Sequence, residues 1–115
     1  MHELALSEQI VRTALRASGA RKDSITAIAV QVGALSAVSV SALEFCLRVV
    51  LDQYGLKDAE AQIAWVPARV RCECGHCYET EDMFAPCPRC GDYAREVIEG
   101  DNVIIQHVEV EDGED

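Results

Sequence analysis

The sequence predicts an α+β fold: two helices packed on a small three-stranded sheet, with an inserted four-cysteine, zinc-ribbon-like lobe. Three observations support this fold class. Two segments repeat apolar residues at helical spacing, extended segments alternate with them, and two Cys-x-x-Cys motifs stand close together before the last extended segment. The expected order is helix, strand, helix, strand, zinc lobe and strand.

The two helices are predicted over residues 4–18 and 40–54, because each segment has an apolar stripe. The stripes consist of Leu6, Ile10, Ala14 and Ala17 in the first helix, and of Val40, Leu43, Leu47, Val50 and Leu51 in the second. Ser41 to Glu44 fits a capping box, although neighbouring serines leave the start of the second helix open. Cys46 lies beside the second stripe, and we expect it to be a small buried hydrophobe.

Extended structure is predicted in four further segments. Residues 24–32 alternate apolar side chains between two faces, and residues 61–70 do the same with an interruption at Pro67. Residues 93–98 and 103–110 are extended on either side of a turn. The last segment is too apolar for a free tail, so we expect it to return and pair with the earlier strands.

Two cysteine motifs predict a metal site. They are Cys74-x-x-Cys77 and Cys87-x-x-Cys90, separated by nine residues, with a glycine inside the first and another after the second. Four thiolates from two such turns bind Zn²⁺ tetrahedrally and leave no open position, so the metal would be structural. An iron tetrathiolate is a minor variant of this interpretation. The alternative of two disulfides needs an oxidising compartment, and the chain begins without a signal-peptide pattern.

Three residues near the motifs have open roles. Cys72-x-Cys74-x-x-Cys77 offers three thiols for two places, and we assign Cys74 and Cys77 because Cys-x-x-Cys is the better knuckle. Cys72 is then a strand residue beside the metal. His76 is expected to be an exposed knuckle side chain, with donation to a sulfur or ligand replacement as alternatives. His107 is expected to be structural or at the surface, with a smaller chance of completing a metal site.

The N-terminus, Met1-His2-Glu3, offers a second kind of metal site. The α-amine, the amide nitrogen of His2 and its imidazole can chelate one metal through small rings. Nitrogen-rich, square-planar sites of this kind suit Ni(II) or Cu(II). Glu3 adds an amide and a carboxylate nearby. Because most chains that begin Met-His bind nothing there, this signal is weak by itself.

Composition excludes several classes of protein. The formal net charge of −10 argues against nucleic acid, whose binders carry a basic footprint. No apolar run approaches the ~20 residues that a membrane span needs. With no signal peptide, a cytoplasmic location is expected. The predicted domains are a nickel-binding α+β domain of residues 1–70 plus 101–115 and a zinc-binding lobe of residues 71–100.

Taken together, Met1-His2-Glu3, the order of elements and the paired cysteine motifs resemble the HypA/HybF family of nickel metallochaperones for nickel–iron hydrogenase maturation. The similarity covers the whole chain. Residues 32–36 look like the glycine-containing turn of that family after the first strand, residues 41–45 like the opening of its second helix, and Cys87-Pro88-Arg89-Cys90 like its second knuckle.

The resemblance implies that the chain binds and delivers Ni(II) during hydrogenase maturation and carries a structural Zn(II). It implies a nickel site at Met1, His2 and Glu3. It also implies a zinc site, whose ligands would be Cys74, Cys77, Cys87 and Cys90. The implied partners are a nickel-handling maturation GTPase and the hydrogenase large-subunit precursor, with the chain itself a monomer or weak homodimer.

Two other functions compete with this one. A zinc-ribbon protein-interaction adaptor needs only the cysteine motifs and treats His2 as incidental. A redox enzyme of thioredoxin type expects one Cys-x-x-Cys that opens a helix after a strand, whereas this chain has two in a turn-rich segment. With no carboxylate pair, nucleophile elbow or phosphate-binding glycine loop in the sequence, we predict that the protein is not an enzyme.

Overall fold

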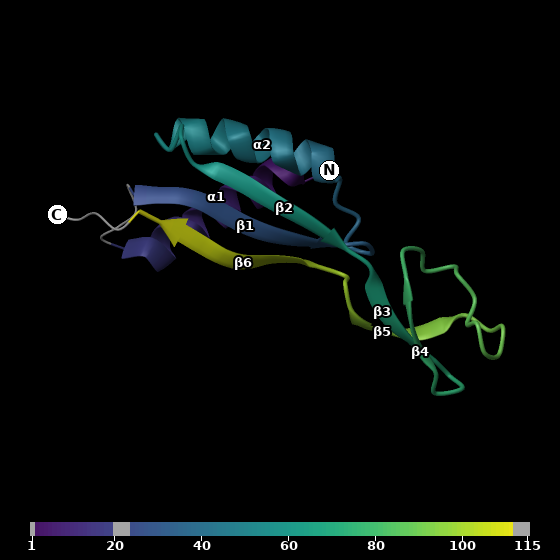
Figure 1. Ribbon diagram of the computed structural model, residues 1–115. Helices are drawn as coiled ribbons and strands as arrows, with labels where there is room; N and C mark the ends of the chain where they lie inside the picture. The colour runs from purple at the N-terminus through teal and green to yellow at the C-terminus, as the bar shows by residue number, and fades with distance from the viewer. Residues whose placement is uncertain (1, 20–23, 112–115) are drawn as a thin grey trace. The chain divides into compact units, whose positions relative to one another are not determined.

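The computed structural model describes residues 2–19 and 24–111, and it has the predicted α+β architecture (Figure 1). Its helices are α1 (Glu3–Ser18) and α2 (Val40–Gln53). Its strands are β1 (Ile25–Gly33), β2 (Glu60–Val66), β3 (Ala68–Cys72), β4 (Cys77–Thr80), β5 (Ala94–Glu99) and β6 (Val103–Val110). In the described part, the strands form two three-stranded sheets, β2-β1-β6 and β4-β3-β5, where the sequence predicted one sheet.

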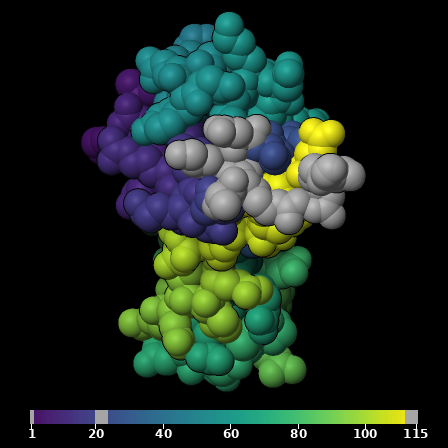
Figure 2. Space-filling model, turned by 90° about the vertical axis from the view of Figure 1, so that its left-hand side faces the viewer, coloured from purple at the N-terminus to yellow at the C-terminus, as the bar shows by residue number. Residues whose placement is uncertain are grey.

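The helices have most of the apolar faces that their sequences predict, although Ala17 of the predicted stripe of α1 is exposed. α1 buries Ile10, Val11 and Ala14, and α2 buries a stripe. The buried stripe of α2 consists of Leu43, Leu47, Val50 and Leu51. The two helices pack against each other, and their surfaces adjoin in Figure 2 as purple and teal. Burying one such aliphatic side chain stabilises a fold by about 1.5–3 kcal/mol, so the helix pair holds a large share of the core.

The start of α2 is fixed by Ser39. Its side-chain oxygen accepts a hydrogen bond from the amide of Ala42 at 3.2 Å, and its extended φ of −79° and ψ of 120° are typical of an N-cap residue. The cap therefore lies two residues before Ser41, with which the predicted capping box began. The sequence did not show which serine caps the helix, because each serine before α2 can act as an N-cap residue.

β1 is the central strand of its sheet and is buried along most of its length, with Ile28 and Val32 fully inaccessible. Two backbone hydrogen bonds join β1 to β6: one joins the end of β1 to the start of β6, and the other joins the start of β1 to the end of β6. The amide of Gly33 donates to the carbonyl of Asn102 at 3.0 Å, and that of Glu111 donates to the carbonyl of Ser24 at 2.8 Å. The last segment therefore returns antiparallel to the first strand, which confirms the expected pairing.

Pro67 divides the predicted strand of residues 61–70 into two strands of different sheets. β2 ends at Val66 and β3 begins at Ala68. Proline has no amide hydrogen to donate to a ladder and has a fixed φ, so a strand cannot run through it with regular pairing. The expected interruption is confirmed, and its effect is larger than a bulge.

The chain divides into two compact units. Unit 1 comprises Met1–Val30, Val38–Ala64 and Ile105–Asp115, and unit 2 comprises Gln31–Ala37 and Trp65–Ile104. Unit 2 contains the whole β4-β3-β5 sheet and five of the six cysteines. The domain boundaries predicted from the sequence, 1–70 plus 101–115 and 71–100, stay a prediction. Among the described helices, neither has the length and apolar character that crossing a membrane demands.

Candidate metal centre

Four cysteine thiols of unit 2 converge on one point. The sulfur atoms of Cys72, Cys74, Cys87 and Cys90 all lie within 4.8 Å of one another. Cys72 Sγ is 3.3 Å from Cys90 Sγ, and Cys74 Sγ is 3.8 Å from Cys87 Sγ. A tetrahedral zinc ion with Zn–S bonds of about 2.3 Å needs sulfur–sulfur separations of about 3.8 Å. The donor set therefore fits a closed tetrathiolate metal site.

The first cysteine turn spans residues 72–76. Gly75 donates its amide to the carbonyl of Cys72 at 2.9 Å, and Cys72 donates its own amide to the carbonyl of His76 at 2.9 Å. Gly75 has a φ of 93°, which a side chain would disfavour, so this glycine allows the turn to close directly after Cys74.

The second cysteine turn, residues 87–92, is built in the same way. Gly91 donates to the carbonyl of Cys87 at 2.9 Å, Cys87 donates to that of Asp92 at 2.6 Å, and Gly91 has a φ of 82°. The amides of Arg89 and Asp92 also point at sulfur, 3.4 Å from Cys87 Sγ and 3.5 Å from Cys90 Sγ. In both turns a left-handed glycine directly follows the second converging cysteine, so Cys72 and Cys74 correspond to Cys87 and Cys90.

The structure departs from the predicted ligand set at one position. It brings together Cys74, Cys87 and Cys90 as predicted, but the fourth thiol of the group is Cys72 and Cys77 is outside it. The reason lies in strand alternation. Cys77 is paired with Arg71 across the β3–β4 ladder, so both side chains lie on one face of the sheet, whereas Cys72 lies on the opposite face and is 2% exposed.

Cys87 and Cys90 differ in pKa. Burial opposes ionisation of Cys87, but the amides of Cys90 and Arg89 outweigh it and lower the pKa of Cys87 to about 7. For Cys90, the amide of Asp92 favours the thiolate, yet hydrogen bonding to Cys72 and burial raise the pKa to about 12. Cys87 therefore forms a thiolate more readily than Cys90, and a divalent cation bound by both would displace the proton of Cys90.

Among the described residues, the histidines and the other cysteines lie outside the cysteine group. The half-buried His76 ring stacks on Tyr78 with centroids 6.2 Å apart, so His76 is less exposed than the sequence predicted. Burial and the nearby cysteines raise the pKa of Tyr78. His107 lies at the surface, as expected, with its Nε2 3.0 Å from a carboxylate oxygen of Glu109. Cys46 is half-buried on α2.

The predicted nickel ligands lie at the start of α1, except Met1, which is outside the described residues. His2 is exposed and is the N-cap residue of α1, and its carbonyl accepts the first helical hydrogen bond from the amide of Leu6 at 2.8 Å. The Glu3 carboxylate accepts the amide of Ser39 at 3.0 Å, and this bond is the largest cause that lowers the pKa of Glu3. Glu3 is therefore held as a carboxylate beside His2.

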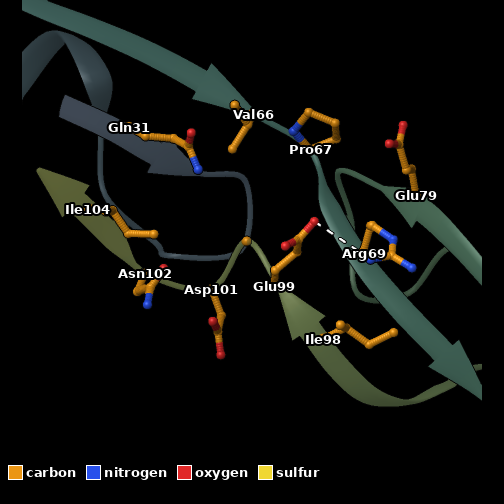
Figure 3. A pocket seen from close by; sticks show the side chains of 11 residues that line it. Gln31, Val66, Pro67, Arg69, Glu79, Ile98, Glu99, Asp101, Asn102 and Ile104 are labelled. Atoms are coloured by element: carbon orange, nitrogen blue, oxygen red, sulfur yellow. Dashed lines mark ion pairs between the residues drawn. The ribbon is translucent and has the colours of Figure 1, made fainter. Parts of the chain in front are cut away.

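A polar cavity of about 550 Å³ lies in unit 2, beside the ends of β3 and β5 (Figure 3). Arg69 and Glu99 form an ion pair of 3.8 Å across it, and Glu79 and Asp101 lie around the same cavity. Charged side chains on adjacent strands stabilise a sheet through such cross-strand pairs. The cavity brings together no cysteine or histidine, so it does not extend the metal centre.

The fold and the cysteine group define a class: small α+β proteins with a lobe in which four cysteine thiols converge and could hold a metal ion. The sequence profile of one family, described as "Hydrogenase/urease nickel incorporation, metallochaperone, hypA", matches residues 1–110. Hydrogenase maturation factors HypA of Geobacter metallireducens and Geobacter sulfurreducens are each 32% identical to this chain, over 112 and 114 residues, covering 96% of the chain and 100% of each relative.

The same fold appears among solved structures. The solution structure of the Ni metallochaperone HypA from Helicobacter pylori matches with a TM-score of 0.68 at 17% identity, covering 96% of this chain and 97% of that one. The chain belongs to the HypA family of hydrogenase maturation nickel metallochaperones. The family resemblance found in the sequence is thereby confirmed. The names of these relatives describe a maturation factor and metallochaperone rather than a catalyst.

Proposed function

We propose that this protein binds Ni(II) at its N-terminus and delivers it during hydrogenase maturation. The observation that carries the proposal is the combination of family membership with an exposed His2 at the helix start, beside the ionised Glu3. The nickel ligands would be the Met1 amine, the His2 amide and imidazole, and Glu3. A carrier must release its metal, and an exposed terminus is suited to reversible binding.

The cysteine group would hold a structural zinc. We assign the ligands to Cys72, Cys74, Cys87 and Cys90, on the convergence of their sulfur atoms. A closed tetrathiolate supplies no open coordination position, so its contribution would be to stabilise unit 2 rather than to perform chemistry. The expected partners are the nickel-handling GTPase and the hydrogenase large-subunit precursor.

The test is a Ni(II) titration of the zinc-loaded chain with its authentic Met1 terminus. We expect saturable 1:1 binding that is lost or weakened by at least about tenfold when His2 is replaced by alanine or when one residue is added before Met1, because either change removes a nitrogen ligand or its small chelate ring. Isothermal titration calorimetry and the visible absorption of square-planar Ni(II) would measure it. Since the ligands must lose protons, acid should release the nickel.

His107→Ala is the matched control, because His107 is another exposed histidine and is placed at the far end of the sequence. It should leave nickel binding unchanged. Equal nickel binding by the authentic, extended and His2→Ala chains, with zinc retained, would rule out the N-terminal site. The protein would then be better described as a zinc-ribbon interaction adaptor.

A further inference from the structure

A short loop of unit 2 exposes two apolar side chains. It spans residues 81–86, between β4 and the second cysteine turn, and is called the Phe84 loop below. Phe84 is 79% exposed, the highest value among the large apolar side chains of the described residues, and the adjacent Met83 is 37% exposed. Exposed aromatic and methionine side chains are enriched in the centres of protein interfaces.

The Phe84 loop is held in one conformation by its own hydrogen bonds. Thr80 Oγ1 accepts the amide of Asp82 at 3.0 Å and donates to its carbonyl at 2.7 Å. The Asp82 carboxylate accepts the amide of Phe84 at 2.9 Å, and the Asp82 carbonyl accepts the amide of Ala85 at 3.1 Å. The Tyr78 hydroxyl donates to the carbonyl of Ala85 at 3.0 Å. A preorganised loop loses little conformational entropy when it binds.

The chain segment that contains Phe84 is acidic. Glu79, Glu81 and Asp82 precede it, all exposed, and the segment 78–86 contains no lysine or arginine. The whole chain carries a formal net charge of −10. A second copy of this chain would bring the same charge to the contact and be repelled, whereas a basic surface would be attracted.

We propose that Met83 and Phe84 anchor this protein to a partner protein whose surface has an apolar pocket bordered by lysine and arginine side chains. Phe84 would fill the pocket, and Glu81 would face the basic rim. This inference deepens the proposed function, since it gives the metal lobe a docking residue, and only the choice of probe proteins rests on that function. Nickel at the N-terminus is not required for the contact.

The experiment measures binding of the full, zinc-loaded chain to two purified proteins, the nickel-handling maturation GTPase and the hydrogenase large-subunit precursor of the same organism. We expect Phe84→Ala to raise the Kd for one of them by at least about tenfold, as removal of an interface anchor does. Phe45→Ala is the matched control, because Phe45 is 70% exposed on α2 and lies outside the loop. Glu81→Gln should reduce the salt dependence of the association rate.

The proposal is overturned if neither protein binds the parent chain, or if both bind Phe84→Ala within about twofold of the parent. It is also overturned if Phe45→Ala and Phe84→Ala cause the same loss, which would indicate general stickiness of apolar surface. Sedimentation showing a dimer that Phe84→Ala abolishes would identify a second copy as the occupant instead. Nickel titration of Phe84→Ala should match the parent, so failure of the carrier site and failure of the docking loop give separate signals.

Discussion

Replacing Cys72 by serine is expected to release the zinc, whereas Cys77→Ser should retain one zinc per chain. The Cys72 sulfur lies within 4.8 Å of those of Cys74, Cys87 and Cys90. Cys77 is the register partner of Arg71 in the β3–β4 ladder, so its side chain lies on the opposite face of the sheet from Cys72. Structural Zn²⁺ sites contribute apparent binding free energies of about 10–16 kcal/mol. Loss of one of four thiolates should therefore unfold much of unit 2 and leave the helices of unit 1 in place.

Zinc stoichiometry after dialysis against a moderate chelator measures this effect, and hydrogen exchange of the β3–β5 amides reports the loss of structure. The two serine variants are matched, because each exchanges one sulfur for oxygen within the same short segment. A double variant with serine at both positions tests whether Cys77 can stand in for Cys72. Retention of zinc by Cys72→Ser with loss in Cys77→Ser would restore the Cys74–Cys77 knuckle as the ligand pair.

Most of the fold could be predicted from the sequence because its signals are periodic. Leu43 and Leu47 recur at helical spacing and lie fully buried on α2, and the apolar segment of residues 24–32 forms β1, a strand of nine residues that is buried on both faces. The separation into two sheets could not be predicted. It depends on Pro67 ending one ladder and on β5 pairing with β3, a long-range choice that local patterns do not specify.

The sequence predicted that cysteines would converge, but it did not predict which four thiols the structure brings together. Counting Cys-x-x-Cys spacing selected Cys77, because spacing ignores the face of the strand on which each side chain lies. The position of the glycines was the signal that could have identified Cys72. Gly75 directly follows Cys74, as Gly91 directly follows Cys90. By this comparison Cys74 is the second cysteine of its turn, and the first cysteine must precede it in the sequence, where Cys72 lies. The N-terminal nickel site stays a prediction, which rests on the chelating chemistry of His2 and on the family resemblance.

Gly100→Ala is expected to be strongly destabilising, because it combines backbone strain with a steric clash. Gly100 has a φ of 97°, and a Cβ there would lie 2.5 Å from Ala68 Cα and 2.8 Å from Ala68 Cβ. Left-handed backbone costs a non-glycine residue about 1–2 kcal/mol, and forcing atoms into a packed region costs about 1–3 kcal/mol more. The expected loss of stability is therefore about 2–5 kcal/mol, the sum of the two ranges.

Gly55→Ala separates the two causes. Gly55 has a φ of 79°, yet nothing lies within 4 Å of the position its Cβ would occupy, so only the strain of about 1–2 kcal/mol applies. Chemical denaturation followed by far-ultraviolet circular dichroism and by fluorescence of Trp65, the single tryptophan, would give both free energies of unfolding. Equal losses in the two variants would mean that the backbone around Gly100 and Ala68 relaxes without cost. A larger loss in Gly100→Ala would show that close backbone contact, and not turn geometry alone, requires glycine before β6.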